Sequence, residues 1–202
     1  MVRIKICGVT RVADAELAIA LGADMIGLNF YPPSPRSISR ERAGEIARAV
    51  AGRALIAGVF VNATREYIEQ RRREAALDLL QFHGDEDESA LAGWPVKVIR
   101  AFRVKAGAPA GLIGKCGADF FLFDTYHPGL FGGTGRVRPL GGLGAFSLAR
   151  VFISGGLSPG NVAAAAALNP YAVDVASGVE SSPGIKDAAK LRSFIVNAKS
   201  PR

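Results

Sequence analysis

Short apolar stretches alternate with alanine-rich amphipathic stretches along the whole chain, and this alternation limits the possible folds more than any other feature. Several apolar stretches have no polar residue at their centre, as in 120–123 (FFLF). Continuous apolar strands are typical of a parallel sheet covered by helices. We expect strands at about 2–7, 24–30, 54–61, 77–82, 96–102, 119–124, 150–154 and 171–175. Eight such units within 202 residues predict an α/β protein, a single (β/α)8 TIM barrel over residues 1–202.

Capping residues support this division, because a polar side chain before a helix can accept a hydrogen bond from its first turn. The expected caps and helices are Thr10 with 11–21, Ser39 with 40–50, Thr64 with 65–74, Ser158 with a helix from Pro159, and Asp187 with a helix to about Ala198. Gly22 is expected to end the first helix. The stretch 126–145 is rich in Gly and Pro, so helix six is expected to be short or irregular.

The alternative architecture is a doubly wound open sheet. Such a sheet usually carries a Gly-x-Gly-x-x-Gly motif at its first turn, and the turn at 7–10 (CGVT) lacks it. The glycine-rich turn follows the seventh strand instead, which favours the barrel.

Composition excludes several protein classes. Hydrophobic residues make up 49% of the chain, which suits one globular domain and argues against disorder. No apolar run approaches the roughly 18 residues of a membrane span, so no membrane partner is expected. The two cysteines lack metal-ligand spacing and no signal peptide is recognised, so we expect a cytoplasmic protein without a bound metal.

The chain is basic, with a net charge of +7 from 25 basic and 18 acidic residues. This charge suits a nucleic acid, a small anionic substrate or merely a solvated basic surface. The densest basic run, 70–73 (QRRR), lies in an expected helix beside three glutamates and has no aromatic residues interleaved. We therefore interpret it as an exposed helix face and expect no nucleic-acid partner.

Two residues that end expected strands are candidates for acid–base catalysis, because function in such barrels gathers at the carboxyl ends of the strands. Cys7 ends the first strand and is either a small buried apolar residue or a general base acting as thiolate. Asp124 ends the sixth strand and is either a loop cap or a general acid. Lys5 lies on the same strand face as Cys7 and is expected to favour the thiolate. Lys5 is also expected to form a buried ion pair with Asp174 on the eighth strand.

Residues after other strands can bind an anionic ligand. Arg36 lies in a proline-rich loop, where it is either exposed to solvent or holds a carboxylate through two hydrogen bonds. Glycine-containing loops follow the seventh and eighth strands, and their backbone N–H groups can approach a phosphate. The candidate phosphate-binding residues are Gly155, Gly156, Ser177 and Gly178. His83, after the fourth strand, is interpreted as a structural loop residue.

With these residues in hand, the chain resembles the phosphoribosylanthranilate isomerases of tryptophan biosynthesis. The motifs that carry the resemblance span nearly the whole chain: 5–10 (KICGVT), 31–36 (YPPSPR), 59–62 (VFVN), 81–86 (QFHGDE), 123–125 (FDT), 154–157 (SGGL) and 173–187. One region departs from the family, because 136–144 (RVRPLGGLG) replaces its usual lysine- and aromatic-containing segment. Arg136 is the residue that can replace the family's lysine.

The resemblance implies an Amadori rearrangement of N-(5-phosphoribosyl)anthranilate to the corresponding 1-deoxyribulose 5-phosphate. It implies Cys7 as general base, Asp124 as general acid and Arg36 as the residue that holds the anthranilate carboxylate. It implies no cofactor and no metal, and the partner expected is a small phosphorylated substrate. We expect a monomer rather than a homodimer.

Two other functions fit parts of the pattern. The first is another sugar-phosphate barrel enzyme, such as the Amadori isomerase of histidine biosynthesis, but that enzyme uses two aspartates, and Cys7 argues against it. The second is a non-catalytic module that binds a phosphorylated ligand or RNA, which predicts strong salt dependence and tolerance of Cys7→Ala.

Overall fold

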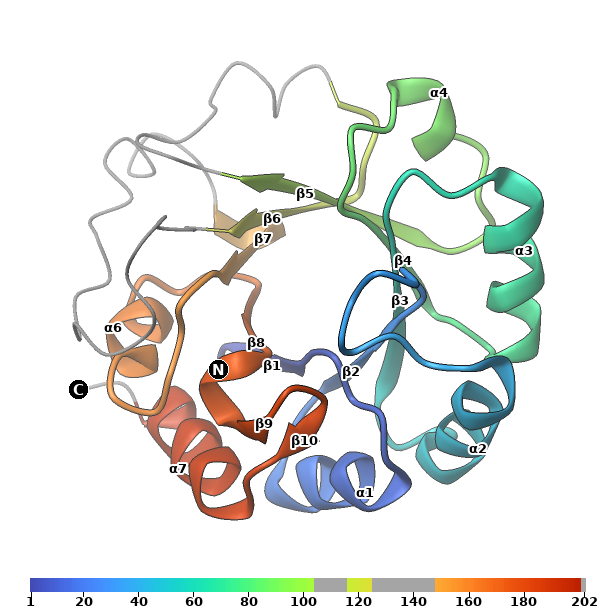
Figure 1. Ribbon diagram of the computed structural model, residues 1–202. Coiled ribbons are helices and arrows are strands. Elements are labelled where there is room, and N and C mark those ends of the chain that lie inside the picture. The colour runs from blue at the N-terminus through green and yellow to red at the C-terminus, as the bar shows by residue number, and fades with distance from the viewer. Residues whose placement is uncertain (104–115, 125–147, 201–202) are drawn as a thin grey trace.

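The computed structural model describes residues 1–103, 116–124 and 148–200, and within them eight parallel strands close into a barrel in the order of the sequence (Figure 1). The strands are β1 (Arg3–Ile6), β2 (Met25–Asn29), β3 (Leu55–Phe60), β4 (Leu79–Phe82), β5 (Lys97–Arg103), β6 (Phe120–Asp124), β7 (Val151–Ser154) and β8 (Ala172–Val175). The barrel is closed by pairing of β1 with β8. The closed barrel confirms the expected fold and rules out the open doubly wound sheet.

Helices surround the barrel on its outer side (Figure 1). The α-helices are α1 (Val12–Leu21), α2 (Arg40–Val50), α3 (Arg65–Glu74), α4 (Glu88–Leu91), α6 (Val162–Ala167) and α7 (Ala188–Lys199). Short 3-10 turns occur at η2 (Leu148–Arg150) and η3 (Ser177–Val179). The irregular helix expected within 126–145 lies outside the described residues. None of the helices in the described part of the chain combines the length and apolar character needed to cross a bilayer.

Two apolar cores hold the barrel together, one inside the sheet and one between the sheet and the helices. Side chains alternate between the two faces of a strand. Along β6, Leu122 faces the barrel interior with Phe152, whereas Phe121 and Phe123 face the helices. The same alternation assigns Asp124 to the interior face, at the end of the strand. In this way the two cores fix which strand-end residues reach the barrel mouth.

Three expected helix caps are confirmed. The side chains of Ser39, Thr64 and Asp187 each accept a hydrogen bond from a backbone N–H in the first turn of α2, α3 and α7. Gly22 ends α1 with a φ of 101°, a left-handed conformation that glycine adopts without strain.

Two expected caps are wrong, because another contact engages the side chain or the helix begins later. The Thr10 hydroxyl donates to the Gly184 carbonyl oxygen at 2.6 Å, and α1 is preceded by Arg11, which makes no side-chain capping hydrogen bond. The chain forms a turn at 159–161, and α6 begins only at Val162. Thr10 therefore ties the loop after β1 to a segment that follows β8.

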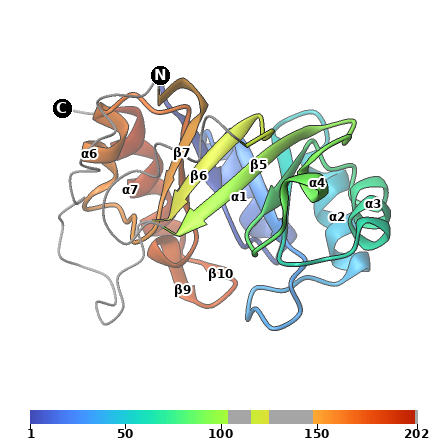
Figure 2. The same ribbon diagram turned by 90° about the horizontal axis from the view of Figure 1, so that it is seen from above.

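A small hairpin after β8 adds to the barrel on the side where the strands end. It consists of β9 (Glu180–Ser182) and β10 (Ile185–Lys186), which pair in antiparallel fashion. Figure 2 shows the hairpin on the side of the molecule toward which the β5 and β6 arrows point. Strands of three and two residues are too short to leave a periodic pattern in the sequence, and we did not expect this hairpin.

Candidate active site

Cys7 directly follows β1 and is partly buried at the barrel mouth. Its backbone N–H donates to the Val175 carbonyl oxygen on β8 at 2.8 Å, which continues the β1–β8 pairing one residue beyond the strand. A side chain at Gly27 on β2 would lie 2.9 Å from the Cys7 Sγ atom. The absence of a side chain at Gly27 therefore leaves room for the thiol.

Burial raises the pKa of the Cys7 thiol, and the charge of Asp174 acts in the same direction. Lys5 and Lys186 both lower that pKa, but the net result lies above the usual value of a thiol. Lys5 thus favours the thiolate, as expected, but its effect on the pKa of Cys7 is smaller than the effect of burial. At neutral pH the free protein holds Cys7 mainly as the thiol.

Lys5 and Asp174 form the buried ion pair expected from the sequence. They are register partners on β1 and β8, with Lys5 Nζ 2.7 Å from Asp174 Oδ1 and the Lys5 side chain fully buried. The Ser154 hydroxyl donates to the other carboxylate oxygen of Asp174 at 2.9 Å. Burial lowers the pKa of Lys5, but the charges of Asp174 and Cys7 outweigh burial and hold it above its usual value. A permanent ammonium group therefore lies beneath Cys7.

Asp124 ends β6 and has His83 as a neighbour. His83 Nε2 lies 3.6 Å from Asp124 Oδ2, beyond hydrogen-bond distance, and forms an ion pair only when the imidazole is protonated. The Gln81 amide nitrogen lies 3.1 Å from His83 Nδ1. The structure therefore puts His83 beside the candidate acid, although sequence reasoning treated it as structural. The position of His83 directly after β4, on the same side of the barrel as Asp124, is the sequence feature that indicates this proximity.

Arg36 lies in the loop after β2 and contacts a residue that sequence reasoning missed, Glu180 on β9. Its Nε atom lies 2.9 Å from Glu180 Oε1, and its Nη2 atom lies 2.6 Å from Oε2. The side-chain carbons of Arg36 pack closely on Gly8. A Cβ atom on Gly8 would lie only 2.5 Å from Arg36 Cδ. Arg36 is thereby held against Gly8, the residue that follows Cys7 after the end of β1.

The two glycine-containing loops expected to bind phosphate lie against each other. Gly155 and Gly156, after β7, have φ values of 84° and 65°, a left-handed conformation that favours glycine. Ser177 and Gly178 begin the turn η3, after β8. A Cβ atom on Gly178 would lie 1.9 Å from the carbonyl oxygen of Leu157. The close approach of the two loops therefore depends on the missing side chain at Gly178.

Replacing Gly178 by Ala is expected to separate the two loops, because the new methyl group meets a backbone carbonyl that has no flexible end to move. A shift of about 1 Å in a substrate-positioning loop can cost roughly 10²-fold in rate, so we expect kcat/KM to fall by about 10- to 100-fold. Gly160→Ala is the matched control, since its Cβ would meet only Ser158 Oγ at 3.8 Å. Steady-state kinetics on both variants check this, and equal kcat/KM values for the two would contradict it.

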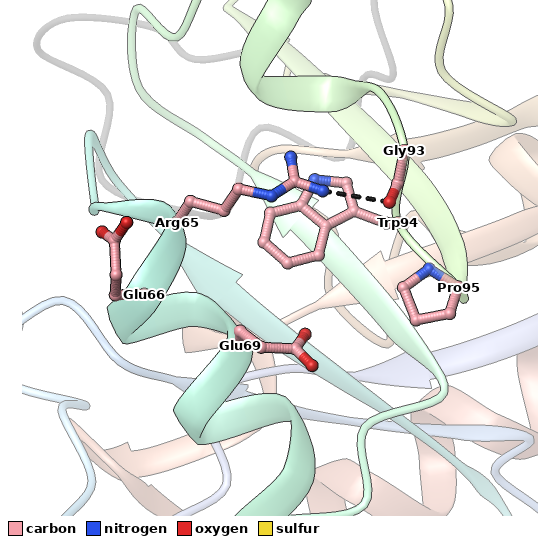
Figure 3. Close-up of a pocket in the computed structure, with 6 residues that line it drawn as sticks. All are labelled: Arg65, Glu66, Glu69, Gly93, Trp94 and Pro95. Carbon is pink, nitrogen blue, oxygen red and sulfur yellow. Dashed lines mark hydrogen bonds between the residues drawn. The ribbon is translucent and has the colours of Figure 1, made fainter.

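A second feature lies away from the barrel mouth, on the outer wall of the barrel. It is an open groove of about 320 Å³ between α3 and the segment that follows α4 (Figure 3). The Arg65 guanidinium lies over the Trp94 ring, 4.2 Å from its centroid, and donates to the Gly93 carbonyl oxygen at 3.0 Å. Glu69 pairs with Arg72 and with its neighbour Arg73. These contacts engage Arg65 and Glu69, and they agree with the expectation that the run at 70–73 lies on a helix face.

Comparison with known proteins fits the geometry at the barrel mouth. The family model described as N-(5'phosphoribosyl)anthranilate (PRA) isomerase matches residues 4–197. The chain belongs to this isomerase family. The N-(5'-phosphoribosyl)anthranilate isomerase of Pseudomonas paraeruginosa is 47% identical over 197 residues, which cover 96% of this chain and 93% of that protein.

Solved structures of the isomerase family agree with this result. The chain is similar to the crystal structure of phosphoribosyl anthranilate isomerase from Thermus thermophilus, with 36% identity, a TM-score of 0.87 and coverage of 99% and 100% of the two chains. It is also similar to a family structure in complex with reduced 1-(o-carboxyphenylamino)-1-deoxyribulose 5-phosphate, at 33% identity and a TM-score of 0.82, with coverage of 98% and 99%. The family resemblance seen in the sequence is thus confirmed.

Proposed function

We propose that this isomerase rearranges N-(5-phosphoribosyl)anthranilate to 1-(2-carboxyphenylamino)-1-deoxyribulose 5-phosphate, with Cys7 as general base and Asp124 as general acid. The observation that carries the assignment is the position of both residues at carboxyl ends of barrel strands, on the interior face, in a member of this family. Strands β7 and β8 separate them around the barrel, so they can reach a substrate at the mouth from different sides.

The proton transfers follow from these positions. Asp124 donates a proton to the furanose ring oxygen, the bond from that oxygen to C1 breaks, and the nitrogen lone pair forms a Schiff base. The Cys7 thiolate then removes the C2 proton. The electrons of the C2–H bond form a double bond between C1 and C2, and the π electrons of the C1–N double bond return to the nitrogen, which gives a neutral enolamine. The enolamine becomes the ketone when C1 gains a proton and the 2-hydroxyl group loses one. Each turnover therefore leaves Asp124 without its proton and Cys7 with one extra, and a proton must return before the next cycle.

Two further sets of residues support the substrate assignment. Arg36 is proposed to hold the anthranilate carboxylate, since it packs against Gly8, the residue that follows Cys7, and a guanidinium group binds carboxylates through paired hydrogen bonds. The backbone N–H groups around Gly155, Gly156, Ser177 and Gly178 are proposed to bind the phosphate. The net charge of +7 suits a substrate that carries both a phosphate and a carboxylate.

We also propose that the protein acts as a monomer in the cytoplasm. In the described part of the chain the exposed large apolar residues are spread over separate elements, as with Leu55 on β3 and Val196 on α7, and so do not suggest a dimer interface. A base that must remain a free thiol suits a reducing compartment. Light scattering coupled to size-exclusion chromatography tests the monomer.

The direct test of the function is a fluorescence assay with the purified protein. The assay follows the fluorescence of phosphoribosylanthranilate, which is expected to fall as the rearrangement consumes it. We expect first-order loss of fluorescence proportional to enzyme concentration. No enzyme-dependent loss would refute the proposed function.

The raised pKa of Cys7 predicts where activity falls at high pH. The active form of the free enzyme carries one proton on the pair made by the acid and the base. This proton is lost when the pH rises above the higher of the two pKa values of the pair, so kcat/KM declines only there. Because burial raises the pKa of the Cys7 thiol above its usual value of about 8.5, we expect the decline to begin above about pH 8.5. A pH profile of kcat/KM at constant ionic strength measures this, and a decline centred below about pH 7.5 would contradict it.

A further inference from the structure

Glu180 on β9 makes contacts that the proposed proton transfers do not use. Its side chain is only 4% exposed, and its carboxylate accepts hydrogen bonds from two cations at once. The Arg36 guanidinium donates from Nε and Nη2, and the Lys186 ammonium group donates from Nζ at 2.8 Å. The backbone N–H of Gly184 adds a fourth donor at 3.2 Å. Burial raises the pKa of Glu180, but the hydrogen bonds and charges of Arg36 and Lys186 outweigh it and leave the pKa lowered, so the carboxylate is charged at neutral pH.

Glu180 occupies one edge of the Arg36 guanidinium group, and this determines which of its N–H donors a ligand can use. A guanidinium group carries five N–H donors in one plane and can pair with a carboxylate along its Nε–Nη2 edge or along its Nη1–Nη2 edge. Glu180 occupies the Nε–Nη2 edge. Within the described residues, no partner is found for Arg36 Nη1, and the Arg36 side chain is 22% exposed. The second edge is therefore open to one more carboxylate.

Lys186 connects this clamp to the backbone of Cys7. Its ammonium group is fully buried and donates to the Cys7 carbonyl oxygen at 2.6 Å and to the Ala176 carbonyl oxygen at 3.3 Å, in addition to Glu180. All three ammonium donors are thus used. The position of the Arg36 fork is fixed with respect to the residue proposed as base, through a chain of contacts from Arg36 to Glu180, to Lys186 and to Cys7.

The hairpin that carries Glu180 and Lys186 is itself held in place from two sides. The backbone N–H of Lys186 donates to Asp14 Oδ2 on α1 at 3.0 Å, and Lys190 Nζ donates to the Glu180 carbonyl oxygen at 2.8 Å. A rigid support of this kind is what a positioning residue needs, because a small displacement of the fork would spoil a bidentate contact.

We propose that Glu180 is a positioning residue for substrate selection: it clamps one edge of Arg36 so that the other edge selects substrates whose aromatic amine carries a carboxylate. This inference deepens the proposed function and depends on it. Arg36, Glu180 and Lys186 carry a combined charge of +1, which also suits an anionic ring substituent. Glu180 itself touches no reacting atom in this proposal.

Glu180→Gln tests the inference because the amide is nearly the same size but brings an N–H donor against two cationic donors. The assay compares N-(5-phosphoribosyl)anthranilate with the same sugar phosphate condensed with aniline, which lacks the carboxylate. We expect the ratio of kcat/KM values for the two substrates to fall by about tenfold or more, the typical effect of losing a charge-assisted hydrogen bond. The loss should lie mainly in KM for the anthranilate substrate, with kcat changed less than about threefold.

The matched control is Glu66→Gln on α3, an exposed glutamate on the outer wall of the barrel, which should keep the wild-type ratio. If Glu180→Gln does not fold because Lys186 is left buried without its carboxylate, the double variant Glu180→Gln/Lys186→Met removes that charge. The double variant should fold and should still lose the selection, because Arg36 remains unclamped. Glu180→Asp, which keeps the charge, should recover part of the ratio.

Two distinct results would overturn the inference. If wild-type protein converts phosphoribosylanthranilate and folded Glu180→Gln or double-variant protein keeps the wild-type ratio within about twofold, Glu180 has no part in selection. If the wild-type protein does not convert phosphoribosylanthranilate at all, the proposed function fails and this inference fails with it. The wild-type assay alone separates the two cases.

Discussion

Replacing Cys7 by Ala is expected to lower kcat by about 10²- to 10⁴-fold, the range that general base catalysis contributes, while KM changes little. Alanine removes the sulfur and leaves the Lys5–Asp174 pair beneath it intact, so the variant should fold. The remaining steps, ring opening and tautomerisation, do not need the thiol. Single-turnover and steady-state kinetics in the fluorescence assay give the measurement.

Cys116→Ala supplies the matched control for the thiol. Cys116 packs against the outer apolar core, as expected for a structural cysteine. This variant should keep kcat within about twofold of the wild type. A Cys7→Ala variant with near-full activity would remove Cys7 from the mechanism. It would also favour the alternative of a barrel that merely binds a phosphorylated ligand.

The position of Cys7 and Asp124 could be predicted because it depends on two simple rules. Side chains alternate along a strand, and parallel strands in a closed barrel all end on the same side. The same rules predicted the pairing of Lys5 with Asp174, since neighbouring strands put inward-facing residues next to each other. Features that depend on strand parity and strand order are therefore accessible from sequence alone.

The support around the site could not be predicted, because it depends on contacts between distant segments without any repeating pattern. Glu180 meets Arg36 across 144 positions of the chain, and Thr10 meets Gly184 across 174. Thr10 resembled a helix cap by local sequence, but its hydroxyl donates to the distant carbonyl instead. Strands as short as β9 and β10 leave no periodicity to detect. The pKa of Cys7 likewise depends on how far burial outweighs Lys5 and Lys186, which sequence spacing does not reveal.

Replacing Asp124 by Asn should also lower kcat by about 10²- to 10⁴-fold, because the amide keeps the shape of the side chain but does not donate a proton as an acid. Substrate should still bind, since the neutral amide carries no charge to repel the phosphate or the carboxylate. The matched control is Asp119→Asn, directly before the start of β6, where Asp119 pairs with Lys97 at 2.6 Å. That variant should lose some stability while its kcat stays within about twofold of the wild type.

Deuterium at C2 of the substrate tells the two roles apart. In Cys7→Ala the transfer of the C2 proton becomes the slowest step, so the isotope effect on kcat should rise above the wild-type value. In Asp124→Asn ring opening becomes the slowest step, and this step precedes breakage of the bond to C2, so the effect on kcat should fall toward unity. The two variants thus move one observable in opposite directions. An isotope effect that rises in Asp124→Asn would mean that Asp124 takes part in the transfer at C2, and the proposed division of labour between acid and base would be wrong.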